Sequence, residues 1–184
     1  MSTPRRTLLS LLSASVLGLP VWAQAQPTAN WPSKPLRIVV GFPAGSSPDL
    51  TARALAEPLE KALGQPVIVD NRVGAGGNIG ADAVAKATDG HTIGLMINGN
   101  LTIARLLNPA LRYDPLNDLT PVSLVGVAPL VLVAPAGAPG ADARAFLAAA
   151  RQAGHQWSYG SPGVGTVGHL GMELLKSRAG LAPV

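Results

Sequence analysis

Three glycine-rich loops contain the residues whose types and spacing could bind a ligand. Their sequences are "GFPAGSSPD" (41–49), "NGNLT" (98–102) and "YGSPGVGTVGH" (159–169). Each loop places backbone N–H groups and small hydroxyl or amide side chains at the expected start of a helix. Such positions attract anions, because the first N–H groups of a helix lack partners and the helix dipole is positive there. Residues 42–49 and 159–169 contain no Lys or Arg, so the expected ligand is a carboxylate held by neutral donors.

Two observations keep a purely structural role open for these loops. Glycine turns and helix caps are needed wherever a strand leads into a helix, whatever the protein does. Asp49 also lies in the first loop, where its negative charge would disfavour an anion. An ion pair with Arg53, four residues further along the expected helix, would absorb that charge.

The last loop also has the spacing of a dinucleotide-binding turn, Gly163-x-Gly165-x-x-Gly168. A ribose-binding acid about 20 residues later is needed for that function, and the sequence supplies none. Ser161 lacks the Gly-x-Ser-x-Gly context of hydrolases, and the three histidines are too far apart for a metal site. We therefore expect no enzymatic activity, no cofactor and no metal. His169, in the first turn of the last expected helix, fits a surface position and a ligand-facing position equally well.

Residues 1–25 have the pattern of a signal peptide. Arg5 and Arg6 precede an apolar run over 7–22, and Ala23-Gln24-Ala25 fits the rule for cleavage after a small residue. The sequence therefore predicts an exported protein, with cleavage near Ala25.

Composition narrows the expected partners. The absence of cysteine excludes disulfides and thiolate chemistry. Loss of the two signal-peptide arginines leaves 14 − 2 = 12 basic residues against 10 acidic ones. A nearly neutral chain with scattered Lys and Arg and 4% aromatic residues gives no reason to expect a nucleic-acid partner.

Strands and helices alternate from residue 36 onward. Short branched apolar runs predict strands at 36–42, 66–71 and 91–97. Helices are predicted at 47–63, with Ser47 as N-cap and Pro58 kinking or splitting the helix, at 79–88, and in a short segment ending at Leu107. This alternation predicts a parallel α/β sheet covered on both faces.

The second half of the sequence is less regular. The apolar stretch 119–137, broken by Pro129, predicts two strands or one strand that crosses between lobes. A helix at 140–153, a strand at 157–161 and a helix at 166–178 capped by Gly180 follow. Residues 182–184 look like the start of a further strand.

The order of several motifs behind a signal peptide resembles a known family. The motifs are "GFPAGSSPDLTAR", "VDNRVGAGGNIG", "DGHTI", "LRYDPLNDLTPVSLV" and "YGSPGVGTVGHLGMELL". They are similar to those of the tripartite tricarboxylate transporter substrate-binding proteins, also called the Bug receptor family. The resemblance covers residues 31–184.

The resemblance implies a periplasmic-binding-protein-like fold of two α/β lobes with mainly parallel sheets. Residues 26–122 would form the first lobe and 123–184 an incomplete second lobe, since family members have roughly twice this mature length. A monomeric receptor would close its lobes around a small organic acid and deliver it to a membrane permease. An exported ligand sensor, or a truncated receptor fragment without function, are the alternatives.

The resemblance also implies the ligand-binding residues. In the first lobe they are Phe42, Pro43, Ala44, Gly45, Ser46, Ser47, Asp49, Asn98 and Gly99. In the second lobe they are Ser161, Gly163, Gly165, Thr166 and His169. Gly45-Ser46 stands where many relatives have a Gly-Gly pair, which predicts a different choice of ligand.

Overall fold

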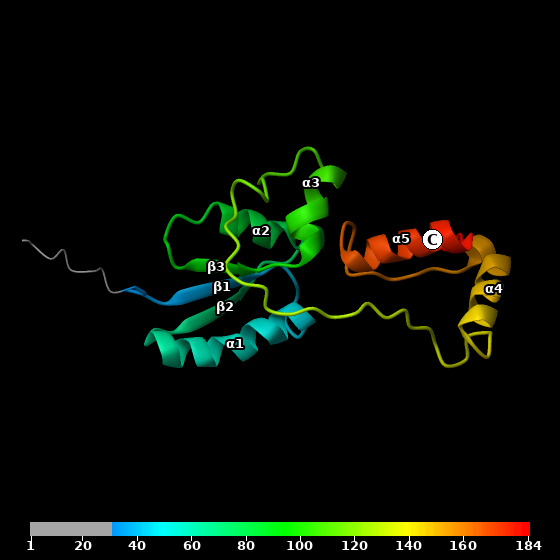
Figure 1. Cartoon of the computed structure of the whole chain (residues 1–184), viewed down its shortest axis with the longest axis horizontal. Coiled ribbons are helices and arrows are strands. Elements are labelled where there is room, and N and C mark those ends of the chain that lie inside the picture. Colours follow the sequence, from blue (N-terminus) through cyan, green and yellow to red (C-terminus); the bar gives the residue numbers. More distant parts are fainter. Residues whose placement is uncertain (1–30) are drawn as a thin grey trace, which may run out of the picture. The chain divides into compact units, whose positions relative to one another are not determined.

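A parallel sheet of three strands organises residues 31–118. The computed structural model describes residues 31–184, so the predicted signal peptide and its cleavage near Ala25 lie outside the described residues. Strands β1 (Leu36–Val40), β2 (Val67–Asn71) and β3 (Thr92–Leu95) lie in the order β2-β1-β3 (Figure 1). Val40 pairs with Asn71 on one side and Leu95 on the other. The three predicted strands are confirmed, and each is shorter than predicted.

Two helices cover the sheet. The chain passes from β1 through α1 (Ser47–Leu63) to β2, and returns through α2 (Asn78–Ala85) to β3. Right-handed crossovers in opposite directions place the two helices on opposite faces of the sheet (Figure 1). The core between α1 and the sheet consists of Ile38, Val40, Phe42 and Ala52, with Leu59, Val67, Val69, Ile93, Leu95 and Ile97 packed against it. The predicted α/β sheet covered on both faces is confirmed.

Two details of α1 differ from the prediction. Ser46 is the N-cap in place of Ser47, and its hydroxyl donates to the Pro43 carbonyl (2.6 Å). Pro58 does not split the helix, which continues to Leu63. Pro58 has no N–H to donate to the Ala54 carbonyl, four residues earlier in the helix. Ala54 and Pro58 are both exposed, so water can hydrate that carbonyl.

Short helices connect the larger elements. A 3₁₀ turn, η1 (Ala75–Gly77), precedes α2, and a π-helical turn, η2 (Gly99–Ile103), leads into α3 (Ala104–Leu107). The C-terminal part contains α4 (Ala143–Ala153), the 3₁₀ turn η3 (Gly154–Gln156) and α5 (Val167–Ala179). Gly180 caps α5 in a left-handed conformation, as predicted.

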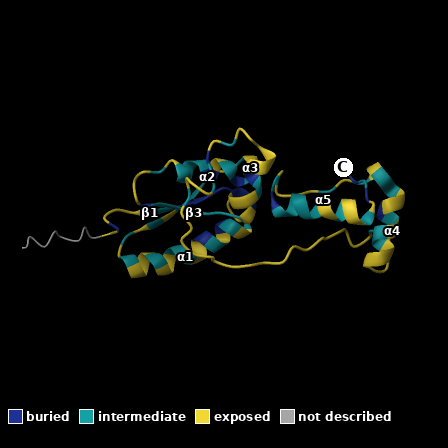
Figure 2. Ribbon diagram, turned by 45° about the horizontal axis from the view of Figure 1, so that its top comes forward, coloured by how far each residue is buried: buried dark blue, intermediate teal, exposed yellow. Residues whose placement is uncertain are grey.

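The predicted strands in 119–137 are wrong. This apolar stretch forms no strand and is exposed at nearly every residue (Figure 2). A strand needs hydrogen-bonding neighbours, and within the described residues no strand pairs with it.

The predicted strand at 157–161 does not form either, although two backbone hydrogen bonds link this segment to Val184. The N–H of Tyr159 donates to the Val184 carbonyl (2.9 Å), and the N–H of Val184 donates to the Trp157 carbonyl (3.0 Å). Two bonds are too few to form a ladder.

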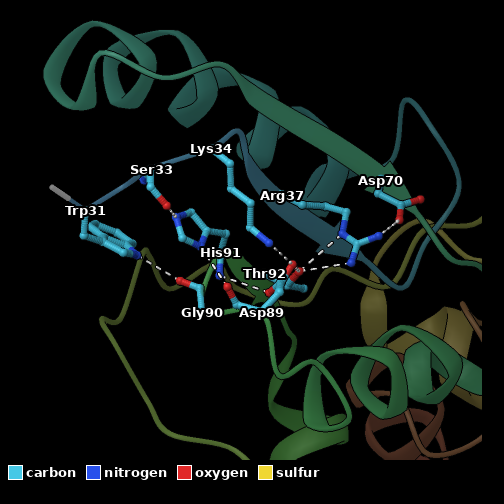
Figure 3. Close-up of polar contacts among 9 residues, drawn as sticks. All are labelled: Trp31, Ser33, Lys34, Arg37, Asp70, Asp89, Gly90, His91 and Thr92. Atoms are coloured by element: carbon cyan, nitrogen blue, oxygen red, sulfur yellow. Dashed lines mark hydrogen bonds and ion pairs between the residues drawn. The ribbon is translucent and has the colours of Figure 1, made fainter. Parts of the chain in front are cut away.

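A polar cluster closes the amino ends of β1 and β3 (Figure 3). The ring of His91 accepts at Nε2 from the Ser33 N–H (3.0 Å), and its Nδ1 lies 2.8 Å from the Asp89 carbonyl oxygen. Since a backbone N–H only donates and a carbonyl only accepts, the ring carries its proton on Nδ1. The Trp31 indole N–H donates to the Gly90 carbonyl (2.9 Å). These bonds attach residues 31–33 to the loop before β3.

The helices of residues 31–184 include none that is both long and apolar enough to cross a membrane. In the same residues, no group of three or more His, Asp and Glu side chains could hold a metal ion.

Candidate functional site

The strand order brings the connections that follow β1 and β3 to the same edge of the sheet, at the carboxyl ends of these strands. The connection after β1 leads to α1 on one face of the sheet, and the connection after β3 leads away from that face (Figure 1). Parallel α/β sheets bind ligands where neighbouring connections diverge in this way. The loops predicted to bind a ligand, 42–49 and 98–99, both lie at this edge.

The first loop is exposed along most of its length. Pro43, Ala44, Gly45 and Ser47 are exposed, whereas Phe42 is 7% exposed and packs in the core. Gly45 has a φ of +81°, a conformation that favours glycine. The loop therefore presents backbone and small side chains at the start of α1, and Phe42 can offer a ligand its backbone only.

Asp49 is enclosed by hydrogen-bond donors of the protein itself. Its side chain is 1% exposed, and its Oδ2 accepts from Arg53 Nε (3.0 Å) and from the Gly45 N–H (2.8 Å). Its Oδ1 accepts from Asn71 Nδ2 (2.9 Å). The Arg53 guanidinium, the Gly45 N–H and the Asn71 amide lower the pKa of Asp49 to about 2. The predicted pair with Arg53 is confirmed, and the enclosure favours a supporting role for this carboxylate.

The second loop begins with Asn98, whose side chain is exposed. Its Oδ1 accepts from the Gly99 N–H (3.1 Å), so its amide N–H₂ is the group that could donate to a ligand. Gly99 is buried, and a Cβ added to it would lie 2.6 Å from the Gly165 carbonyl oxygen. The predicted residues Gly99 and Gly165 are therefore close neighbours within Trp31–Val184.

The third loop is held by its own hydrogen bonds. Thr166, 2% exposed, caps α5 by accepting from the His169 N–H (3.4 Å), and its hydroxyl donates to the Gly163 carbonyl (2.6 Å). The Gly165 N–H donates to His169 Nδ1 (3.3 Å), so the His169 proton lies on Nε2. Ser161 is exposed. Ser161 Oγ and His169 Nε2–H are the donors in this loop best suited to a ligand.

A buried amide cluster behind the second loop was missed from the sequence. Asn100, 2% exposed, donates from Nδ2 to the Gly76 carbonyl (3.0 Å) and to Asn78 Oδ1 (2.8 Å). The Tyr113 hydroxyl donates to the Asn100 carbonyl (2.7 Å). Burial, with a smaller contribution from Asp82, raises the pKa of Tyr113 to about 12. The cluster fixes η2 against the turn before α2.

Asn71 was also missed, although its position was predictable. It ends β2 at the same sheet edge as the first loop, and its amide donates to the Phe42 carbonyl (2.9 Å) as well as to Asp49. Polar residues at the carboxyl ends of neighbouring parallel strands meet at one edge. Applying that rule to "PVIVDN" would have identified Asn71.

A cavity lies elsewhere, beside α4. It measures about 520 Å³ and is lined mainly by apolar side chains, among them Leu132, Val133, Phe146 and Leu175. Asp142 is its one acidic lining residue, and its carboxylate caps α4 by accepting from the Ala145 N–H (2.8 Å). A carboxylate ligand would meet an apolar wall and a like charge there, so we place the candidate site at the loops.

Sequence comparisons find relatives of about twice this length. The family model "Tripartite tricarboxylate transporter family receptor" matches residues 51–184. A protein encoded in the tcbD-tcbE intergenic region of a Pseudomonas species is 42% identical over 157 residues, covering 85% of this chain and 46% of the relative. BugT of Bordetella pertussis is 41% identical over 155 residues, covering 83% and 48%. The chain thus spans about half the length of the curated relatives it matches.

The chain also resembles solved structures, and it again covers about half of each of them. MatC of Rhodopseudomonas palustris, solved with bound malate, has a TM-score of 0.74 and 32% identity, covering 83% of this chain and 53% of that one. A second R. palustris protein, solved with adipate, has a TM-score of 0.72 and 32% identity, covering 84% and 52%. A structure described as a periplasmic transporter has a TM-score of 0.74 and 33% identity, covering 84% and 52%. These likenesses confirm the predicted periplasmic-binding-protein-like α/β fold.

Proposed function

This chain belongs to the tripartite tricarboxylate transporter receptor family, and from that premise we propose that it binds a small organic carboxylate at the three loops. Two structural relatives were solved with malate and with adipate, which are both dicarboxylates. The role is binding rather than catalysis, in keeping with the solute-binding relatives.

The observation that carries the proposal is the first loop. It presents the start of α1 to solvent with no basic side chain, and its one acidic residue is turned inward. Helix geometry leaves the N–H groups of Ser47 and Asp49 without partners inside α1. Because Arg53 pairs with Asp49, the loop can receive an anion without an unbalanced charge beside it.

The remaining predicted residues complete the proposed site. Pro43, Ala44 and Gly45 shape the first loop, and the Asn98 amide supplies a second donor. From the third loop, Ser161 Oγ and His169 Nε2–H would contact the other side of the ligand. Gly163, Gly165 and Thr166 hold that loop in shape. Bridging waters would fill the remaining contacts at little cost in affinity.

The proposal extends to the setting of the chain. Residues 1–25 direct export to the periplasm, and 26–122 and 123–184 belong to a first and a second lobe. The receptor is a monomer that closes around its ligand and passes it to a tripartite-type membrane permease.

Thermal melting of the chain with and without added acids tests the proposal. At 100 times its dissociation constant, a bound acid stabilises by about 2.7 kcal/mol. For a chain of this size, that corresponds to a rise in Tm of about 5 to 10 °C. We expect malate, adipate or a related dicarboxylate to give this rise.

The matched control is the diamide of the same acid, which keeps the carbon skeleton and lacks the charge. An equal rise with acid and diamide would contradict carboxylate recognition. No rise with any di- or tricarboxylate, in a chain that melts cooperatively, would contradict the proposed function.

A further inference from the structure

The amide of Asn71 ties together both ends of the first loop. Val40 and Asn71 are register partners in neighbouring strands, so the side chain of Asn71 lies beside the point where β1 enters the loop. Its Nδ2 donates to the Phe42 carbonyl at the start of the loop (2.9 Å) and to Asp49 Oδ1 (2.9 Å). Its Oδ1 accepts from the Arg53 guanidinium (3.3 Å). The Asn71 side chain thus contacts Phe42, Asp49 and Arg53.

Asp49 extends this connection to the middle of the loop. Its Oδ2 accepts from the Gly45 N–H at 2.8 Å. Gly45 itself has a φ of +81°. Asn71 fixes one carboxylate oxygen and Gly45 is fixed by the other. The conformation of the exposed tip, Pro43 to Gly45, therefore depends on a side chain from a strand more than 20 residues away.

We infer that Asn71 and Asp49 are positioning residues, which hold the first loop in its binding conformation and do not contact the ligand. The inference rests on the proposed function, because positioning is defined by the ligand that the loop receives. It assigns a role to Asn71, and it moves Asp49 from ligand contact to support.

Charge balance is consistent with this arrangement. The Asp49 carboxylate has donors on both oxygens, and Arg53, 51% exposed, provides the compensating positive charge. Hydrogen bonds to charged groups are among the stronger ones in proteins, so their loss should change the shape of the loop.

The test exchanges the carboxylate of Asp49 and the amide of Asn71. Asn71→Asp replaces the donor with an acceptor facing both Asp49 Oδ1 and the Phe42 carbonyl. The double variant Asp49→Asn/Asn71→Asp restores a donor and acceptor pair between the two side chains and keeps the net charge of the wild type. Asn117→Asp is the control, since Asn117 Nδ2 donates to Asp114 Oδ2 (3.0 Å) in an exposed connection and the change adds the same charge.

Two measurements are made on each full-length variant. The first is the ¹H–¹⁵N resonance of Gly45, which reports the hydrogen bond to residue 49 without any ligand. The second is the dissociation constant for malate and for adipate. We expect Asn71→Asp to shift the Gly45 resonance and to weaken binding about tenfold or more, as for one charged hydrogen bond.

The double variant should return the Gly45 resonance towards its wild-type position and recover part of the affinity. Recovery is partial, since the carboxylate introduced at position 71 cannot donate a hydrogen bond to the Phe42 carbonyl. Asn117→Asp should change neither measurement.

Unchanged affinity in Asn71→Asp alongside a shifted Gly45 resonance would overturn the positioning role. Failure of the double variant to recover the Gly45 resonance would overturn it as well. If Asn71→Asp does not fold, Asn71→Ala, which removes the donor without adding charge, takes its place. If the wild type binds no di- or tricarboxylate, the proposed function fails, while the Gly45 resonance still decides whether Asn71 shapes the loop.

Discussion

The two ends of the three-stranded sheet use polar residues in opposite ways. At the amino ends, the Ser33 N–H donates to the His91 ring, and the Trp31 and His91 rings donate to carbonyls of the loop before β3 (Figure 3). At the carboxyl ends, the pair of Asp49 and Asn71 supports a loop whose tip stays exposed. At the amino ends, the hydrogen bonds attach residues 31–33 to the loop before β3. At the carboxyl ends, they fix the conformation of the first loop and leave its tip exposed.

The comparison teaches that a polar cluster alone does not mark a binding site. Both clusters contain an Asp that accepts a backbone N–H: Gly45 to Asp49 and His91 to Asp89. Only the carboxyl-end cluster lies where helix α1 begins, so that helix N–H groups remain beside it. The direction of the strands explains the difference, because in a parallel sheet all the connections into the following helices leave from one edge.

The largest expected effect is at the carboxyl end, where backbone segments pack without side chains between them. A Cβ added to Gly41 would lie 2.6 Å from both Cα and the carbonyl oxygen of Gly77, which are backbone atoms that cannot rotate away. We expect Gly41→Ala to lower the free energy of unfolding by about 3 kcal/mol, measured by urea denaturation. Gly126→Ala is the control, since an added Cβ there meets nothing within 4 Å. Equal losses in the two variants would contradict this packing.

The amino-end cluster should affect stability without affecting binding. His91→Leu removes the acceptor of the Ser33 N–H and the bond to Asp89. We expect the free energy of unfolding to fall by about 1 to 2 kcal/mol, with the dissociation constant for malate unchanged. His155→Leu, at an exposed histidine, should alter neither quantity. A loss of affinity in His91→Leu would break the division between the two ends.

Acid should weaken the carboxyl-end cluster through Asp49. Its pKa is lowered to about 2, chiefly by Arg53, against an ordinary value of about 3.9 in an unfolded chain. Because the pKa of Asp49 is lower in the folded state than in the unfolded state, ionised Asp49 stabilises the fold. This contribution is complete above about pH 5 and is lost as the pH falls towards about 2. The Tm difference between wild type and Asp49→Asn should therefore narrow from about pH 5 to about pH 2.

The acid at the amino end provides the comparison for this titration. The His91 N–H is the main cause that lowers the pKa of Asp89, whose side chain is 34% exposed. Asp89→Asn should show the same trend with a smaller amplitude. A Tm difference for Asp49→Asn that stays constant with pH would contradict the assigned hydrogen bonds.

The smallest effect is expected from the outermost ion pair of the amino end. Lys34 Nζ lies 3.8 Å from Asp89 Oδ2, and its side chain is 50% exposed. Exposed pairs of this kind contribute little, so Lys34→Met should lower the free energy of unfolding by less than about 0.5 kcal/mol. A loss as large as that of His91→Leu would mean that charge, and not the His91 hydrogen bonds, holds this cluster together.

The sequence predicted features that depend on near neighbours. The alternation of strands and helices, the Gly180 cap and the pair of Asp49 and Arg53 all follow from periodicity or a four-residue spacing. One error came from a feature that near neighbours in the sequence do not decide: residues 119–137 have a strand-like composition but no strand beside them in the described chain. Pro58 does not split α1, because water can satisfy the carbonyl that lacks its N–H partner at this exposed position.

By itself, the sequence determined the fold class and the three loops, because glycine turns, caps and apolar periodicity act over a few residues. Only the tertiary structure decided which distant side chains support those loops through hydrogen bonds. Asn71 reaches Phe42 across 29 residues, and Asn100 reaches Asn78 across 22. Such contacts depend on strand register and on the crossing of chain segments, which place distant polar groups within hydrogen-bonding distance.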